Sequence, residues 1–216
     1  MVRPPAPTRP LPFPRLTMPL LGYSDRINHA LAFAAKHHDQ QVRKGTRLPY
    51  TTHAANLAVI LTRYGCADDV VVAGILLDVV EDWVRDGVDA AVLAERIGGK
   101  FGGEALALAL EVAERRHDDD GVELSAEDRR ADRLYRLGTA SPGAQWVAAA
   151  DAVHQVNVVL SDLRRTAFPE TVWGRQALGR EGTVAWFGEV ANRLAAAGAA
   201  AAALEELRGA LARLAD

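Results

Sequence analysis

The sequence predicts an all-α protein, a single-domain bundle of helices. Apolar residues recur three or four positions apart behind capping residues, as where Ser24 precedes Ile27, Leu31 and Ala34. No segment alternates polar and apolar residues for long enough to predict a strand with assurance. The run 70–77 is apolar nearly all round, which favours a helix at the centre of the bundle. Its β-branched residues would also suit a strand, but its length and the lack of neighbouring strand-like runs favour helix.

Composition narrows the class of protein. The 216 residues are enough for one sizeable core, and a net charge of -3 without a strongly basic block argues against DNA or an anionic membrane as the main partner. Cys66 is the only cysteine, so neither an internal disulfide nor a thiolate zinc site can form, which fits a reducing cytoplasm. No run approaches the ~18 to 20 apolar residues of a membrane span. The sequence leaves open whether the chain forms a homo-oligomer.

The positions of the prolines and glycines divide the chain into three expected segments. Residues 1–22 hold seven of the prolines and are expected to be a flexible tail. Residues 23–198 are expected to form the main helical domain, and residues 199–216 an Ala-rich helix packed on it.

Helices are expected in order along this domain. Ser24 caps the first, Thr51 or Thr52 the second, and the third covers 68–84. A short helix opened by Asp89 ends at Gly98 and Gly99. Further helices are expected at 103–116, 125–137 and 142–163, then one long helix from Pro169 to Gly198, with Trp173, Trp186 and Phe187 as core, and a last one to Leu214.

Three carboxylates stand out inside the third helix. Asp78, Glu81 and Asp82 are spaced i, i+3 and i+4, so they share one helical face within an otherwise apolar run. Buried carboxylates need protons or cations, which predicts a metal or an Arg and Lys cluster there. A polar stripe that faces water is the alternative, and this segment alone does not decide between them.

Four motifs in order resemble the HD-domain phosphohydrolases, in particular the hydrolase domain of RelA/SpoT enzymes and the small alarmone hydrolases. They are His38-Asp-Gln-Gln-Val-Arg-Lys, Pro49-Tyr-Thr-Thr-His, Asp78-Val-Val-Glu-Asp, and Ser141-Pro-Gly-Ala followed by Ala150-Asp. The resemblance covers about residues 26–195 and implies the HD-type helical fold. It also implies removal of the 3′-pyrophosphate from ppGpp or a similar nucleotide, the chemistry of the stringent response.

The resemblance assigns roles to individual residues. His53, Asp78 and Asp151 would be ligands of Mn²⁺ or a similar divalent ion, and Glu81 and Asp82 would position or activate the attacking water. The substrate-binding residues that it implies are Arg43, Lys44, Arg116, Arg129 and Gln155, the last in place of an asparagine. His37, His38 and His154 are expected to be structural or to support the ligands, and His117 with Asp118 lies in a polar loop and is not expected to bind metal.

The chain departs from the family at one ligand. Leu77 stands where the family has the histidine of its His-Asp dipeptide, and a leucine offers no donor atom to a metal. Three functions therefore stay open: an alarmone pyrophosphohydrolase, a degenerate HD protein that binds a nucleotide or protein as a regulator, and an HD phosphatase for another nucleotide. Ala148 and Gln155 favour the last of these, because they replace family residues at positions associated with alarmone recognition, and Ala54 replaces the family's proline after the first histidine.

Overall fold

The computed structural model describes residues 22–43, 46–118 and 120–215, and all of its regular elements are helices. The predicted all-α class is confirmed: within the described residues, β-structure is limited to the isolated bridges Val42 to Pro49 and His117 to Glu123. The predicted tail lies outside the described residues except for Gly22. The elements are α1 (Asp25–His37), α2 (Thr51–Arg63), α3 (Asp68–Arg85), α4 (Ala90–Leu93), the π-helix η1 (Ala94–Gly98), α5 (Gly99–Phe101), α6 (Gly103–Val112), α7 (Ala126–Leu137), α8 (Pro142–Arg165), α9 (Pro169–Trp173), α10 (Gly179–Ala197) and α11 (Ala201–Ala215).

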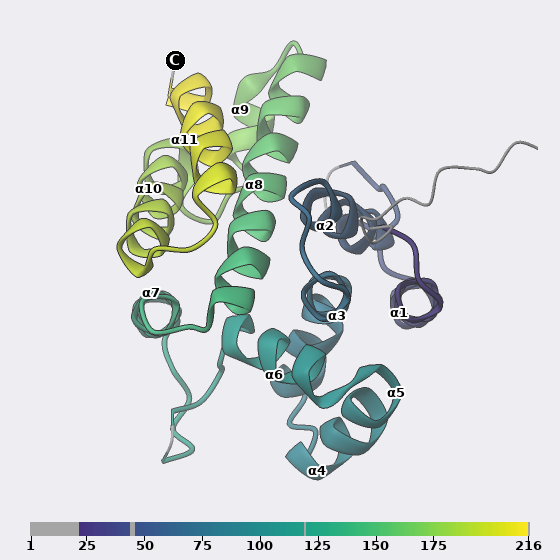
Figure 1. The fold of residues 1–216 in the computed structure, drawn as a ribbon. Coiled ribbons are helices and arrows are strands. Elements are labelled where there is room, and N and C mark those ends of the chain that lie inside the picture. Colours follow the sequence, from purple (N-terminus) through teal and green to yellow (C-terminus); the bar gives the residue numbers. More distant parts are fainter. Residues whose placement is uncertain (1–21, 44–45, 119, 216) are drawn as a thin grey trace, which may run out of the picture.

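Helix α8 runs through the middle of the molecule, between two groups of helices (Figure 1). Helices α1, α2 and α3 lie on one side of it, and α10 and α11 lie on the other. Helix α6 crosses below and packs against both α3 and α8. Helices that are far apart in sequence, α2, α3 and α8, therefore meet at one place, where the candidate site is built.

Helix α3 is the buried helix that the apolar run predicts. Every residue from Val71 to Leu77 is buried, and Leu77 is only 1% exposed. Gly74 lets α2 approach closely, because a Cβ there would lie 2.5 Å from Cδ1 of Leu61. The carboxylates of α3 therefore lie on a buried helix that packs closely against its neighbours.

The predicted caps hold for three helices. Ser24, Ser125 and Ser141 accept hydrogen bonds from backbone N–H groups in the first turns of α1, α7 and α8. The cap expected at Thr51 or Thr52 is wrong. Tyr50 is the N-cap residue of α2, and the Thr52 hydroxyl instead donates to the carbonyl of Pro49 at 2.8 Å.

Three helix boundaries also differ from expectation, and the first is the end of α6, which lies at Val112 and not at Arg116. Gly98 and Gly99 do not end the short helix; the chain continues through η1 and α5 to Phe101 and turns at Gly102, where φ is +100°. The long helix expected from Pro169 is broken after Trp173 and resumes at Gly179, where φ is +64°. Its Trp173, Trp186 and Phe187 pack against the core as expected.

The last helix, α11, packs on α8 and α10 and buries Leu204, Leu207 and Leu214. Gly198 in the left-handed region ends α10 and allows the chain to reverse. None of the helices in the described part of the chain has the length and apolarity needed to cross a membrane.

Candidate metal and catalytic site

Three helices bring together the residues predicted as metal ligands. His53 in the first turn of α2 places Nε2 3.6 Å from Oδ2 of Asp78 on α3 and 3.4 Å from Oδ1 of Asp151 on α8. His53 and Asp151 are buried, at 6% and 3% exposure. His53 and Asp151 are 98 residues apart in the sequence, yet these three side chains lie close together in the interior.

The donor types present suit a divalent cation, although the three ligand atoms do not all lie within 4.8 Å of one another. Oδ2 of Asp78 is buried and makes no hydrogen bond within the described part of the structure. Burial, together with the charges of Asp151 and Asp82, raises the pKa of Asp78 to about 7. A carboxylate oxygen without a partner beside an imidazole nitrogen is a set of donors that suits Mn²⁺ or a similar ion.

The fourth position of the family's ligand set stays apolar. Leu77 lies in the core, so no donor comes from that residue. Asp151 has other partners as well: Arg133 donates to Oδ2 at 2.9 Å and Gln155 donates to Oδ1 at 2.7 Å. Burial alone would raise the pKa of Asp151, but the charges of Arg133 and His53 outweigh it and hold that pKa below its usual value.

A cavity of about 300 Å³ opens beside this cluster. Glu81 and Asp82 line it, and their environments push their pKa values apart. Burial raises the pKa of Glu81 to about 7, against the lowering effect of the Arg133 charge. The remaining lining residues are Tyr50, Asp78, Arg85, Glu114, Arg116 and Arg129.

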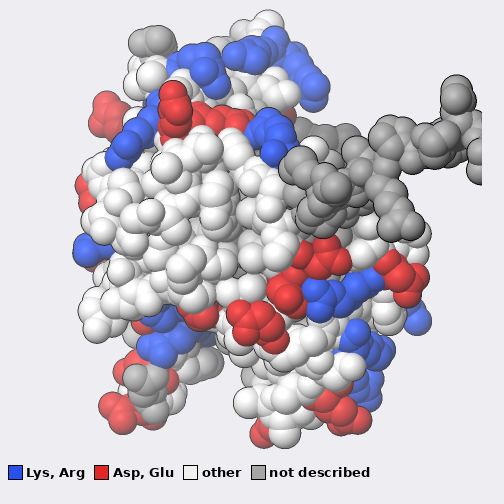
Figure 2. Space-filling model, viewed as in Figure 1, with Lys and Arg blue, Asp and Glu red and all other residues white. Residues whose placement is uncertain are grey.

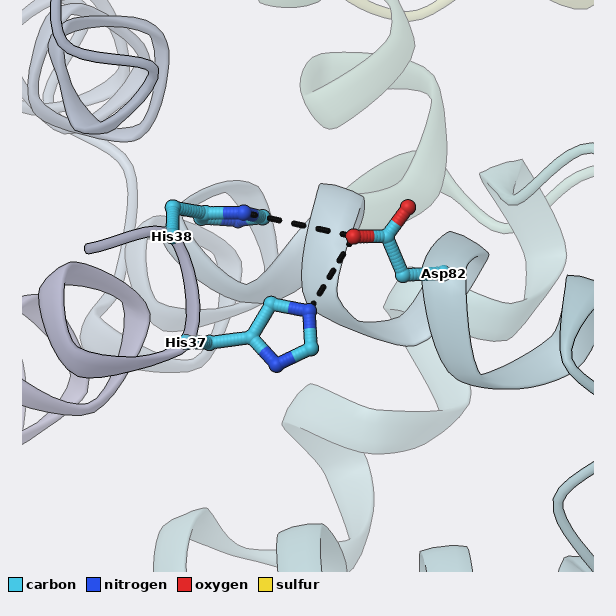
Figure 3. A group of neighbouring side chains, drawn as sticks. All are labelled: His37, His38 and Asp82. Carbon is cyan, nitrogen blue, oxygen red and sulfur yellow. Dashed lines mark hydrogen bonds and ion pairs between the residues drawn. The ribbon is translucent and has the colours of Figure 1, made fainter. Parts of the chain in front are cut away.

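Asp82 remains ionised because donors surround it. Partial burial opposes this, but hydrogen bonds from His37 and Gln41 and the charge of Arg85 hold the pKa of Asp82 below its usual value. His37 Nε2 donates to Oδ2 of Asp82 at 3.1 Å, and His38 Nδ1 lies 4.0 Å from the same oxygen (Figure 3). The ligand atoms of these three residues lie within 4.8 Å of one another, so they too could approach a cation. Nδ1 of His38 is hydrogen-bonded to Oε1 of Gln41 at 2.9 Å, whereas its buried Nε2 makes no hydrogen bond within the described residues.

The predicted substrate-binding residues fall in different places. Arg116 and Arg129 line the cavity, where Arg129 pairs with Glu114 at 3.2 Å and Arg116 pairs with Glu123 at 3.1 Å. Arg43 lies near enough for its charge to lower the pKa values of Asp78 and His53. Lys44 lies outside the described residues.

Gln155 faces the ligand cluster rather than the cavity beside Glu81. Its amide donates to Asp151, and it lines a separate small cavity of about 30 Å³ together with Arg133 and Trp186. The roles that the sequence predicts for all of these residues remain predictions.

The sequence did not point to Arg133, whereas it predicts a structural or ligand-supporting role for His154. Arg133 lies one helical turn after Arg129 on α7, a spacing that could have placed both on the face toward the site. His154 lies three residues after Asp151 on α8, so it also shares a face with a ligand. Its Nδ1 lies 2.7 Å from Nδ1 of His53.

Comparisons with known proteins agree with this fold. A family model described as HD domain matches residues 30–166. A search of curated proteins finds no match. Two solved structures are similar in fold, each at 23% sequence identity.

One of these structures is described as a metazoan ortholog of SpoT that hydrolyzes ppGpp and plays a role in starvation responses; the match has a TM-score of 0.65 and covers 88% of this chain and 96% of that one. The other is a protein of Listeria monocytogenes EGD-e, with a TM-score of 0.60 and coverage of 75% and 97%. Since the family model spans well over half of the 216 residues, the chain belongs to the HD-domain family, the phosphohydrolase family that its motifs predict.

Proposed function

We propose that this chain is a metal-dependent pyrophosphohydrolase that removes pyrophosphate from the 3′-position of a guanosine alarmone such as ppGpp. The observation that carries the proposal is the position of Glu81 and Asp82, which line one cavity together with Asp78, a carboxylate that lies beside His53. Glu81, with a pKa of about 7, can accept a proton near neutral pH, whereas Asp82 stays ionised. Such a pair is the usual basis for assigning a proton acceptor and a charged partner in hydrolysis.

The residues of the cavity can divide the work of hydrolysis. Oε1 of Glu81 accepts a hydrogen bond from the backbone N–H of Glu114 at 3.1 Å, which fixes the carboxylate and leaves Oε2 to take a proton from the attacking water. Asp82, held by His37 and Arg85, orients that water. Arg116 and Arg129 exchange their carboxylate partners for phosphate oxygens, which arginine binds well.

His53, Asp78 and Asp151 would hold the divalent ion. When bound, the ion supplies a lowered pKa for water and neutralises charge on phosphate. The guanosine 3′-diphosphate as substrate is supported by the family resemblance and by what the metazoan structure is described as hydrolysing.

A specific observation favours a second candidate, a degenerate HD protein that binds a nucleotide or a protein partner without hydrolysis. Leu77 is 1% exposed and provides no donor, and both oxygens of Asp151 already accept hydrogen bonds. A third candidate, hydrolysis of another nucleotide, is supported by the position of Gln155, whose amide is turned to Asp151.

Leu77→His separates the candidates. The protein is assayed for Mn²⁺ content and for release of pyrophosphate from ppGpp, with GTP as a competing substrate, as wild type, Leu77→His and Asp82→Asn. We expect activity in the wild type, about tenfold tighter Mn²⁺ binding in Leu77→His, and a loss of about 10² to 10⁴ in kcat for Asp82→Asn.

The outcomes are distinct. A wild type that binds no Mn²⁺ and turns over no nucleotide, while Leu77→His gains both, would establish the degenerate protein. Wild-type activity that Asp78→Ala leaves unchanged would show that the assigned site is not where catalysis takes place.

A further inference from the structure

His37 also lines a second cavity. It has a volume of about 670 Å³ and lies between α1 and the η1 to α5 segment. We call it the basic groove and define it by His29, Phe33, Lys36, His37, Arg96 and Lys100. It shares no lining residue with the cavity beside Glu81, and no carboxylate belongs to its lining.

The cations of the basic groove lack acidic partners. In the described part of the chain, neither Lys36 nor Arg96 forms an ion pair, and the contact of Lys100 is with the ring of Phe33, 5.2 Å from its centroid. The arginines of the first cavity differ, because Arg85 pairs with Asp82 and Arg116 pairs with Glu123. Unpaired cations around one concave surface produce a local positive potential that attracts anions.

Several features of the basic groove indicate which kind of anion it can bind. Lys36, Arg96 and Lys100 are exposed, so their charged groups can reach a ligand without loss of buried contacts. On the face shown in Figure 2, Lys and Arg gather along the side where Figure 1 draws α1 and α5, with acidic residues beside them. Phe33 adds a half-buried apolar wall that is fixed by edge contact with Phe101, at 5.3 Å between centroids.

We propose that the basic groove binds the phosphate chain of a nucleotide-sized polyphosphate, at a site separate from the cavity beside Glu81. Three cations from two segments can each contact a different phosphate, and the volume exceeds what a single phosphate needs. A nucleoside triphosphate and an inorganic polyphosphate present the same phosphate chain, so the groove is assigned to that shared chemistry.

One residue joins the two cavities. His37 lines the basic groove and donates a hydrogen bond to Asp82, which lines the first cavity. A ligand that contacts the His37 ring therefore acts one hydrogen bond away from Asp82. This consequence rests on the proposed hydrolase function, whereas binding in the groove does not.

Binding of GTP and of inorganic tripolyphosphate to the purified chain is measured by calorimetry in EDTA, which removes divalent ions from the first cavity. Arg96→Glu with Lys100→Glu reverses two charges of the groove. The matched control, Arg208→Glu with Arg213→Glu, makes the same change on the exposed face of α11. Arg129→Glu tests the first cavity in the same way.

We expect the groove variant to bind tripolyphosphate at least about tenfold more weakly than wild type, while both other variants bind it as wild type does. Equal affinities for tripolyphosphate and GTP assign the site to the phosphate chain alone, and tighter binding of GTP assigns it to a nucleotide. Wild-type affinity in the groove variant, or loss of binding only in Arg129→Glu, would overturn the proposal.

The groove variant also separates this inference from the proposed function. Arg96 and Lys100, the two residues that it changes, take no part in the assigned catalysis, so its hydrolysis of ppGpp without added tripolyphosphate should equal that of the wild type. A chain that hydrolyses nothing but binds tripolyphosphate in the groove would refute the proposed function and support this site.

Discussion

The Nδ1 atoms of His53 and His154 lie 2.7 Å apart, so one ring donates a hydrogen bond and the other accepts it. Burial lowers the pKa of both rings, that of His154 to about 4, so each carries a single proton near pH 7. If Nε2 of His53 binds a cation, the proton of His53 must be on Nδ1 and must be donated to His154. His154 thus determines which nitrogen of His53 is free.

Replacement of His154 by Phe tests this relationship. The ring stays but the acceptor is lost, so His53 loses the partner that selects its tautomer. We expect Mn²⁺ affinity to fall about 10- to 100-fold, measured by calorimetry. His117→Phe, in an exposed loop, is the control and should bind Mn²⁺ as the wild type does. Unchanged affinity in His154→Phe would show that the bond between the rings does not support metal binding.

The raised pKa of Asp78 predicts a pH dependence of stability in the metal-free protein. The folded pKa is about 7, against about 4 for an unfolded chain, so the folded state binds this proton more tightly. The stabilisation of the folded state by this proton on Asp78 is complete below about pH 4 and is lost as the pH rises through about 7. Wild type should therefore lose free energy of unfolding relative to Asp78→Asn over this range.

Urea unfolding in EDTA from pH 4 to 8 provides the measurement. His154 acts in the opposite direction, since its folded pKa of about 4 lies below 6.5 and favours the folded state as pH rises. Because His154 and Glu81 are present in both proteins, their effects largely cancel in the difference. Parallel stability curves for the two proteins would contradict the raised pKa of Asp78.

Arg133 compensates the buried charge of Asp151. Its guanidinium donates to Oδ2 of Asp151 at 2.9 Å, and the Asp151 side chain is 5% exposed. Arg133→Met would leave that carboxylate without its cation, and we expect a loss of about 3 kcal/mol in the free energy of unfolding. Arg130→Met, three residues earlier on α7, should change it by less than about 0.5 kcal/mol. Equal losses in the two variants would mean that the ion pair adds nothing beyond general packing.

Local patterns in the sequence were sufficient for the class of fold. The capping serines Ser24, Ser125 and Ser141 and the apolar run of α3 depend on neighbours within one or two turns, and these features are in the structure as predicted. The misplaced helix ends at Gly98 and after Trp173 depend on tertiary packing and on left-handed turns at Gly102 and Gly179, which local propensity does not specify.

The sequence by itself determined that this is a helical HD-domain chain, that His53, Asp78 and Asp151 are its candidate ligands, and that Leu77 removes a donor. The tertiary structure alone decided how charge is balanced around them. Arg133, His154 and His37 come from other helices, and their effects on Asp151, His53 and Asp82 depend on distances across the bundle. Electrostatic and hydrogen-bond energies change over an ångström or two, and sequence spacing cannot supply that distance between helices.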